Sequence, residues 1–175
     1  MADWTPSQNQ SEDKKQPDWI IYCDGAWGFA GAGAAAIITS PSGVKMRYAA
    51  RLEFQCTNNI AVYEVVLLRL RKARAMGIQR LIIKIDSQVV AGHIEKGYKA
   101  REPELAKYLQ FLREQEKYFE DFTVKNISTT DNSEADKIAK ATAQNTSLSQ
   151  DVFFQVLTHA SIKANQEVPR EVHIV

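Results

Sequence analysis

Three aspartates carry the side chains in this sequence that are best suited to chemistry. Asp24 ends the apolar run 19–23, and Asp86 ends the run 81–85. Asp136 lies later in the chain, near the start of a helical stretch. Sheets of α/β proteins place their functional groups at the carboxyl ends of buried strands. Because carboxylate oxygens are the ligands that Mg²⁺ and Mn²⁺ prefer, the spacing raises the hypothesis of a shared metal site.

Each of these aspartates alone also fits an ordinary role, as a strand-end acid, a helix cap or a surface charge. The histidines share no ligand spacing and are expected at the surface; they are His93, His159 and His173. A short basic group fits a nucleic-acid backbone contact and a solvated loop equally well; it consists of Lys96, Lys99 and Arg101. The glycine-rich stretch 25–33 lacks a Gly-Lys-Ser/Thr ending, so it predicts a hairpin rather than a phosphate-binding loop.

The bulk composition is that of an ordinary globular protein, with 175 residues, 45% hydrophobic and 25% charged. A net charge of +1 gives no overall attraction to nucleic acid, so any such binding must be local and weak. Two cysteines, Cys23 and Cys56, form no disulfide framework, and Cys23 is expected in the core. With no apolar run of about 18 residues and no signal-peptide pattern, we expect no membrane contact and an intracellular location, nucleus or cytoplasm.

The elements that must position the aspartates follow from hydrophobic spacing. Strands are predicted at 18–24, 34–39 and 44–54, joined by short turns into an antiparallel meander. A long helix at 57–76 is expected to be covered on two sides, and a strand follows at 81–86. The remaining predictions are helices at 87–96 and 102–119, a strand at 122–128 and a helix at 131–143. Strands that alternate with helices indicate a parallel part of the sheet.

The chain divides into three parts by composition. Residues 1–17 are polar and predict a flexible leader. Residues 18–147 form the predicted domain, and 148–175 an extension that resembles a polyprotein linker. The apolar segment 152–157 within that extension has three open interpretations. It packs back on the domain, pairs with the sheet edge of a partner, or has no role.

This order of elements, with its aspartates, resembles ribonuclease H. The sequence is most similar to the ribonuclease H domain of plant gypsy-type LTR retrotransposon polyproteins, over about residues 18–145. The motifs that carry the resemblance are Tyr22-Cys-Asp-Gly-Ala26, Gly31-Ala-Gly33, Thr57-Asn-Asn59, Tyr63-Glu64, Asp86-Ser-Gln88 and Asn132-Ser-Glu-Ala-Asp136-Lys-Ile-Ala139. The resemblance implies an α/β fold with a five-stranded mixed sheet, three antiparallel strands and then parallel ones, flanked by helices.

The resemblance also implies a chemistry. In that family, four carboxylates hold two divalent metals that clamp an RNA phosphodiester and activate water. By this likeness Asp24 bridges both metals, while Asp86 and Asp136 each help to hold one. The residues expected to contact an RNA/DNA hybrid are Asn58, Asn59, Ser87 and Gln88, and the 2′-hydroxyls of the hybrid distinguish RNA from DNA.

Two positions depart from the family pattern. The glutamate expected three residues after the Asn-Asn pair is Val62, which has no oxygen to offer a metal. The histidine expected ten residues before Asp136 is Asn126. Glu64 is a poor substitute, since two residues along a helix turn the side chain by about 200°. Glu134 and Asp131 flank the last aspartate, but nothing in the sequence directs them to a metal.

The sequence therefore supports three functional hypotheses. The first is a retrotransposon-derived ribonuclease H-like domain that binds RNA/DNA hybrids with impaired or absent catalysis, a pseudoenzyme with weak or single-site binding of Mg²⁺ or Mn²⁺. The second is an active, metal-dependent endonuclease for such hybrids. The third is a protein–protein interaction module on the same fold, with an unidentified protein partner.

Overall fold

A mixed β-sheet forms the centre of the computed structural model, which describes residues 17–95 and 102–162. Within these ranges it has six strands in the order β5-β4-β1-β2-β3-β6. Their bounds are β1 (Trp19–Gly28), β2 (Gly31–Thr39), β3 (Lys45–Leu52), β4 (Arg80–Ile85), β5 (Asp121–Asn126) and β6 (Val152–Leu157). β1, β2 and β3 pair antiparallel, whereas β4 and β5 continue the sheet in parallel from β1.

The predicted strand number of five is wrong, because β6 adds a sixth. It pairs in parallel with β3, from Arg47 opposite Val152 to Leu52 opposite Leu157. Residues 152–157 thus pack back on the domain, which was one of the three open interpretations. A pairing between segments so far apart in the chain leaves no local pattern in the sequence. The predicted boundary at residue 147 stays a prediction.

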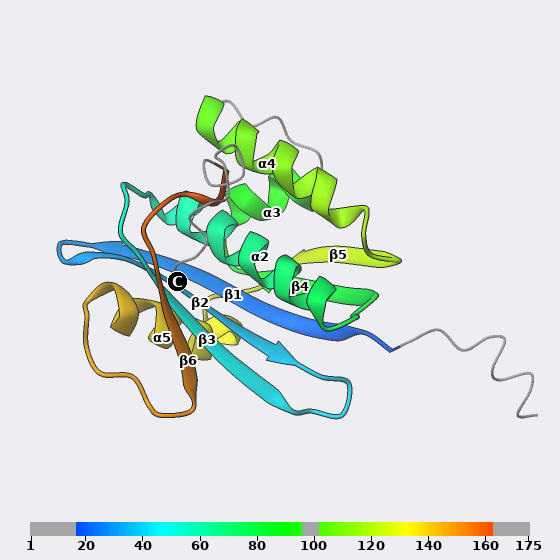
Figure 1. The fold of residues 1–175 in the computed structure, drawn as a ribbon, viewed down its shortest axis with the longest axis horizontal. Helices are drawn as coiled ribbons and strands as arrows, with labels where there is room; N and C mark the ends of the chain where they lie inside the picture. Colours follow the sequence, from blue (N-terminus) through cyan, green and yellow to red (C-terminus); the bar gives the residue numbers. More distant parts are fainter. Residues whose placement is uncertain (1–16, 96–101, 163–175) are drawn as a thin grey trace, which may run out of the picture.

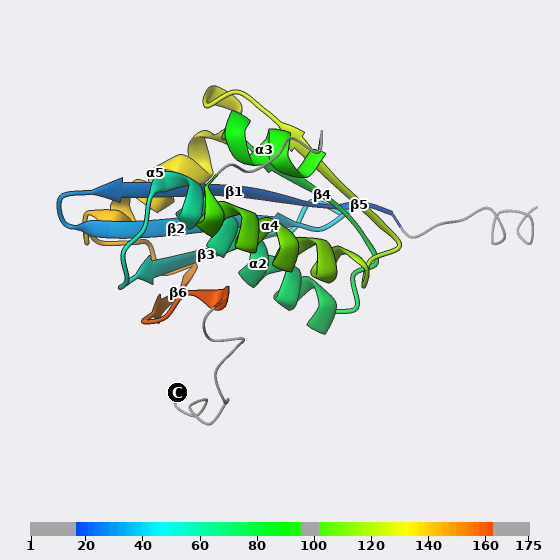
Figure 2. The same ribbon diagram turned by 90° about the horizontal axis from the view of Figure 1, so that it is seen from above.

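Helices cover both faces of the sheet. Their bounds are α2 (Asn58–Ala75), α3 (Gln88–Glu95), α4 (Pro103–Glu116) and α5 (Ser133–Ala143). The first three lie on one side and α5 on the other, and the view from above shows α4 running alongside α2 (Figures 1 and 2). The middle of β2 is buried at every position, as expected of a strand covered on both faces.

Small residues let α5 approach the sheet closely. A Cβ added at Gly33 would lie 2.5 Å from the backbone nitrogen of Ala143 and 2.7 Å from the carbonyl oxygen of Ala139. No side chain fits there, so glycine is required for this contact. The predicted hairpin is confirmed, with Gly28 opposite Gly31 at the end of the β1–β2 ladder.

Helix α2 is the central packing element. Thr57 caps it, and its Oγ1 accepts a hydrogen bond from the Ile60 backbone at 3.2 Å. Residues 60–70 are all buried, because the sheet lies on one side and α4 on the other. The predicted double coverage of this helix is therefore confirmed.

Some predictions lie outside the described residues, namely those for the leader, the basic group 96–101 and His173. In the part of the chain that the structure describes, no helix is long and apolar enough to cross a membrane.

A carboxylate cluster beside an aliphatic side chain

Strand register brings the first two aspartates together. Cys23 on β1 pairs with Ile85 on β4 in the parallel ladder. The next residues on the two strands are Asp24 and Asp86, so they stand side by side where the ladder ends. Asp24 is 6% exposed, and its carboxylate accepts a hydrogen bond of 2.8 Å from the Gly25 backbone.

The third aspartate reaches the same place from α5. Asn132, just before this helix, donates a hydrogen bond of 2.9 Å from Nδ2 to the Cys23 carbonyl oxygen. This bond fixes the start of α5 against β1. Asp136 follows four residues later, about one helical turn, and its carboxyl is close enough to raise the pKa of Asp24. It also pairs with Lys140 Nζ at 3.1 Å.

The pKa of Asp24 reflects the proximity of the three carboxyl groups. Burial, the nearby Asp86 charge and the contact with Asp136 raise the pKa of Asp24 from 3.8 to about 8, against the Gly25 hydrogen bond that lowers it. Carboxylates crowded in a buried place resist ionising together. In the absence of a cation, Asp24 therefore retains its proton at neutral pH.

Val62 lies on α2, at the point where this helix approaches β1. It is 3% exposed. A Cβ added at Gly25 would lie 2.9 Å from the Val62 backbone nitrogen and 2.6 Å from the Ala61 Cβ, so α2 approaches β1 next to Asp24. The position at which the ribonuclease H resemblance predicts a glutamate thus carries two methyl groups.

Glu64 is fully buried and already occupied elsewhere. Its Oε2 accepts hydrogen bonds from the Tyr108 hydroxyl at 2.5 Å and the Ser161 backbone at 2.8 Å. Its Oε1 accepts one from Ser161 Oγ at 2.6 Å. These partners lie on α4 and on the segment after β6. As the helical geometry predicted, Glu64 does not serve the aspartate cluster.

The other flanking acids also lie elsewhere. Glu134 forms ion pairs with Lys45 Nζ at 3.2 Å and with Arg47 Nε at 2.6 Å, on β3. Asp131 is exposed. In residues 17–95 and 102–162, no group of three or more His, Cys, Asp or Glu side chains is arranged to hold a metal ion. Asp86 and Asp136 are close enough to Asp24 to raise its pKa, but the three side chains do not form a finished ligand set.

Polar side chains at the expected hybrid-binding positions adjoin the cluster. Ser87 Oγ donates to Asn59 Oδ1 at 3.2 Å and accepts from the Val90 backbone at 3.2 Å. This links the start of α2 to the start of α3 beside Asp86. Asn58 and Gln88, at the starts of the same two helices, are exposed. These four side chains lie at the rim of the site, at the N-termini of two helices.

Asn126 lies at the end of β5, paired with Ile85, and donates from Nδ2 to the Ile85 carbonyl oxygen at 3.1 Å. His93 corrects a prediction, because it is buried rather than on the surface. Its Nδ1 lies 3.1 Å from the hydroxyl of Tyr63. Sequence reasoning missed this pair, since it joins two different helices, α2 and α3.

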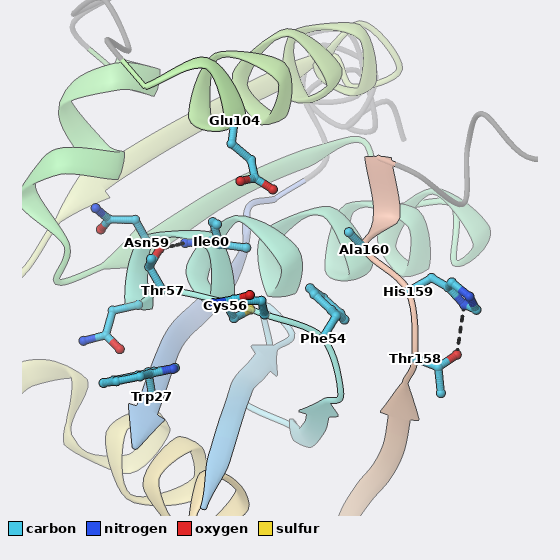
Figure 3. Close-up of a pocket in the computed structure, with 12 residues that line it drawn as sticks. Trp27, Phe54, Cys56, Thr57, Asn59, Ile60, Glu104, Thr158, His159 and Ala160 are labelled. Atoms are coloured by element: carbon cyan, nitrogen blue, oxygen red, sulfur yellow. Dashed lines mark hydrogen bonds between the residues drawn. The ribbon is translucent and has the colours of Figure 1, made fainter. Parts of the chain in front are cut away.

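A second feature missed in the sequence is a groove of about 900 Å³ beside the cluster. The hairpin residue Trp27 and the start of α2 line one side. Phe54 and the segment 158–160 line the other, and Glu104 of α4 lies above them (Figure 3). No local pattern indicates this groove, because residues 158–160 reach its wall only through the pairing of β6.

Comparison with known proteins identifies the family. A family model described as reverse transcriptase-like matches residues 23–142, which include all three aspartates. The chain belongs to the reverse transcriptase-like family. A search of curated proteins gave no match.

Solved structures share the fold of this reverse transcriptase-like domain. Ribonuclease H1 from the archaeon Halobacterium salinarum NRC-1 matches with a TM-score of 0.68 and 22% identity, covering 74% of this chain and 99% of that one. LC11 ribonuclease H1, isolated from compost by a metagenomic approach, matches at 0.66 and 22%, covering 73% and 96%. Its complex with an RNA/DNA hybrid matches at 0.66 and 21%, covering 73% and 98%. The fold is therefore that of ribonuclease H.

Proposed function

We propose that this domain binds RNA/DNA hybrids with impaired or absent catalysis, and that it derives from a plant gypsy-type retrotransposon polyprotein. One observation supports the proposed loss of catalysis: Val62 is buried on α2 at the position where the resemblance to ribonuclease H predicts a glutamate. An aliphatic side chain cannot ligate a cation or accept a hydrogen bond from a ribose hydroxyl. Losing a catalytic group of this kind lowers the rate by orders of magnitude.

Binding of the hybrid rests on the polar edge of the site. Asn58 and Gln88 are free to meet a nucleic-acid minor groove, while Ser87 and Asn59 hold each other in position. Amides and hydroxyls both donate and accept, so they suit the 2′-hydroxyl that marks the RNA strand. LC11 ribonuclease H1, which has the same fold, has been crystallised with an RNA/DNA hybrid.

The carboxylates fit a divalent cation incompletely. Asp24, Asp86 and Asp136 offer the hard oxygen atoms that Mg²⁺ and Mn²⁺ select. However, the raised pKa of Asp24 means that a proton competes with any cation at neutral pH, and Val62 adds no ligand. We expect weak binding at a single site. Such a cation, when bound, would polarise a phosphate and lower the pKa of water.

The position of the loop histidine strengthens the proposal. Asn126 cannot gain or lose a proton in the physiological range, as a histidine does. Its amide donates to the Ile85 carbonyl oxygen, so this side chain contacts the strand that carries Asp86. It can position β5 against β4 but cannot assist turnover by transferring a proton.

Binding and cleavage must be measured separately to test this proposal. A labelled RNA/DNA hybrid is incubated with the native protein in Mg²⁺ or Mn²⁺, beside Val62→Glu, Val62→Gln and a double variant that adds Asn126→His. We expect the native protein to bind the hybrid in preference to double-stranded DNA without cutting it appreciably. Val62→Glu should gain cleavage that Val62→Gln lacks, and Asn126→His should increase it.

Two outcomes would overturn the proposal. Strong cutting by the native protein, abolished by Asp86→Asn, would show an active ribonuclease with an altered metal site. Failure of the native protein to bind any hybrid at low salt would remove the binding function itself. Folding of each variant is checked by circular dichroism, so that a loss of binding is not mistaken for unfolding.

A further inference from the structure

Two large aromatic side chains project into solvent beside the carboxylate cluster and take no part in the proposed chemistry. Trp27 is 62% exposed, and Phe29, in the β1–β2 turn, is fully exposed. Both follow Asp24 closely on the same hairpin. Tryptophan buries much apolar area when it meets a partner, so its exposure next to a candidate binding site indicates an unfilled contact.

Strand geometry directs Trp27 toward the groove. Gly25 faces α2, because a Cβ placed there would lie 2.6 Å from the Ala61 Cβ. Side chains alternate along a strand, so Trp27 points to the same face two residues later. There it lines the groove together with Asn58 and Asn59. Figure 3 shows Trp27 and Asn59 along the same side, with Thr57 between them.

The chemistry of the groove suits the bases of a nucleic acid better than its phosphates. Amides and a hydroxyl line it at Gln55, Asn58, Asn59 and Thr57. Among the described residues that line it there is no lysine or arginine. The carboxylate of Glu104 lines its upper wall. Lysine and arginine supply most of the electrostatic attraction to phosphates. Aromatic faces stack on bases, and amides pair with their polar edges.

We propose that Trp27 is a stacking platform for an unpaired base, at the point where a single-stranded overhang leaves the hybrid bound at Asn58 and Asn59. This inference rests on the proposed hybrid binding and adds a preference for hybrids with a single-stranded end. Stacking is tolerant of sequence because every base has a π-face, so the preference is for unpaired structure rather than for a particular base.

The test compares blunt hybrids with hybrids that carry a short overhang, by fluorescence anisotropy. The native protein should bind the overhang hybrid about tenfold more tightly than the blunt one, and Trp27→Ala should abolish that difference. Trp27→Phe should keep part of it. Tyr118→Ala is the matched control, because this side chain is also an exposed aromatic, at 58%, but follows the far end of α4. It should change nothing.

The salt dependence gives a second readout. If Trp27 acts by stacking, Trp27→Ala lowers the affinity for the overhang without changing the slope of log affinity against log salt concentration. Equal binding of blunt and overhang hybrids, or an overhang preference that survives in Trp27→Ala, would overturn the inference and leave hybrid binding intact. No binding of any hybrid by the native protein would overturn both.

Discussion

At the scale of the single residue, Val62 is where the chain departs from the ribonuclease H pattern that the sequence resembles, which has a glutamate there. Val62 sits where α2 meets β1, and a valine packs in that apolar contact without cost. The same replacement reduces the charge that Asp24, Asp86 and Asp136 must hold together. The proposed loss of catalysis and a gain of stability in the absence of a cation would therefore have the same origin.

This link between charge and stability predicts the effect of placing a glutamate at residue 62. Val62→Glu should lower the free energy of unfolding by about 1–3 kcal/mol in EDTA, because it buries a carboxylate beside Asp24. Excess Mn²⁺ should recover much of that loss, since the cation neutralises the crowded charges. Thermal unfolding with and without Mn²⁺ measures both effects. Val62→Gln introduces a side chain of the same size as Val62→Glu but without charge, so its stability should not respond to Mn²⁺. A response equal to that of Val62→Glu would contradict the electrostatic explanation.

Asp24 itself predicts a pH dependence. Its pKa is about 8 in the folded protein against an ordinary value of 3.8. Between these values the folded protein holds a proton that the unfolded chain releases, so the stabilising contribution is full below pH 4 and is lost as the pH rises through 8. Asp24→Asn should therefore become progressively more stable than the native protein from pH 4 to pH 8, without divalent cations.

The measurement for Asp24 is urea unfolding at a series of pH values. Glu53→Gln is the control, because Glu53 is an exposed carboxylate outside the cluster. Its stability difference from the native protein should stay flat over the same range. A flat difference for Asp24→Asn as well would show that the Asp24 carboxyl ionises normally in the folded protein.

At the scale of the element, the buried acid of α2 has a structural task. Glu64 accepts hydrogen bonds from Tyr108 on α4 and from both the backbone and the hydroxyl of Ser161. It therefore fastens α4 and the segment after β6 to the central helix. The same segment forms a wall of the groove, so Glu64 supports that wall without touching the aspartates.

Removing the hydrogen bonds of Glu64 should lower the free energy of unfolding. Glu64→Ala leaves the Tyr108 hydroxyl and two donors of Ser161 unpaired in the core, and we expect a loss of about 3 kcal/mol in urea unfolding. Ser161→Ala keeps its backbone hydrogen bond and should cost about 1 kcal/mol. Limited proteolysis should cut Glu64→Ala within residues 158–162 before the native protein. Equal stability of the two variants would contradict this role.

The sequence predicted most elements because their signals are local. Thr57 caps α2, Gly77 adopts φ +77° after its end, and the β1–β2 hairpin turns at glycines. The convergence of Asp24 and Asp86 also follows from strand order. The resemblance singled out Val62, and the close approach of α2 at Gly25 explains why this position matters.

Other features depend on contacts between distant parts of the chain. Nothing near Phe153 or Ser161 predicts a sixth strand or a bond to Glu64. His93 was expected at the surface because the histidines share no ligand spacing, whereas its contact with Tyr63 joins two helices. The groove is formed by three separate segments of the chain, so no single stretch of the sequence indicates it.

At the scale of the whole molecule, the last part of the described chain completes the fold. β6 covers the edge of β3, with Phe153 stacked on Tyr48 at a centroid distance of 5.3 Å. Ala160 and Ile162 are buried in the core next to α2. Segment 152–162 is therefore part of the folded unit, although its sequence resembles a linker.

A truncation series tests this conclusion. Ending the chain after residue 147 exposes the edge of β3 and leaves Glu64 without Ser161, so we expect the free energy of unfolding to fall by on the order of 3–5 kcal/mol. An uncovered sheet edge also pairs readily with other chains, so light scattering should show association. Ending the chain after residue 162 is the matched control, because it keeps β6 and Ser161. The variant that ends after residue 162 should retain native stability. If the chain that ends after residue 147 were as stable as the native protein and monomeric, β6 would not contribute to the stability of the fold.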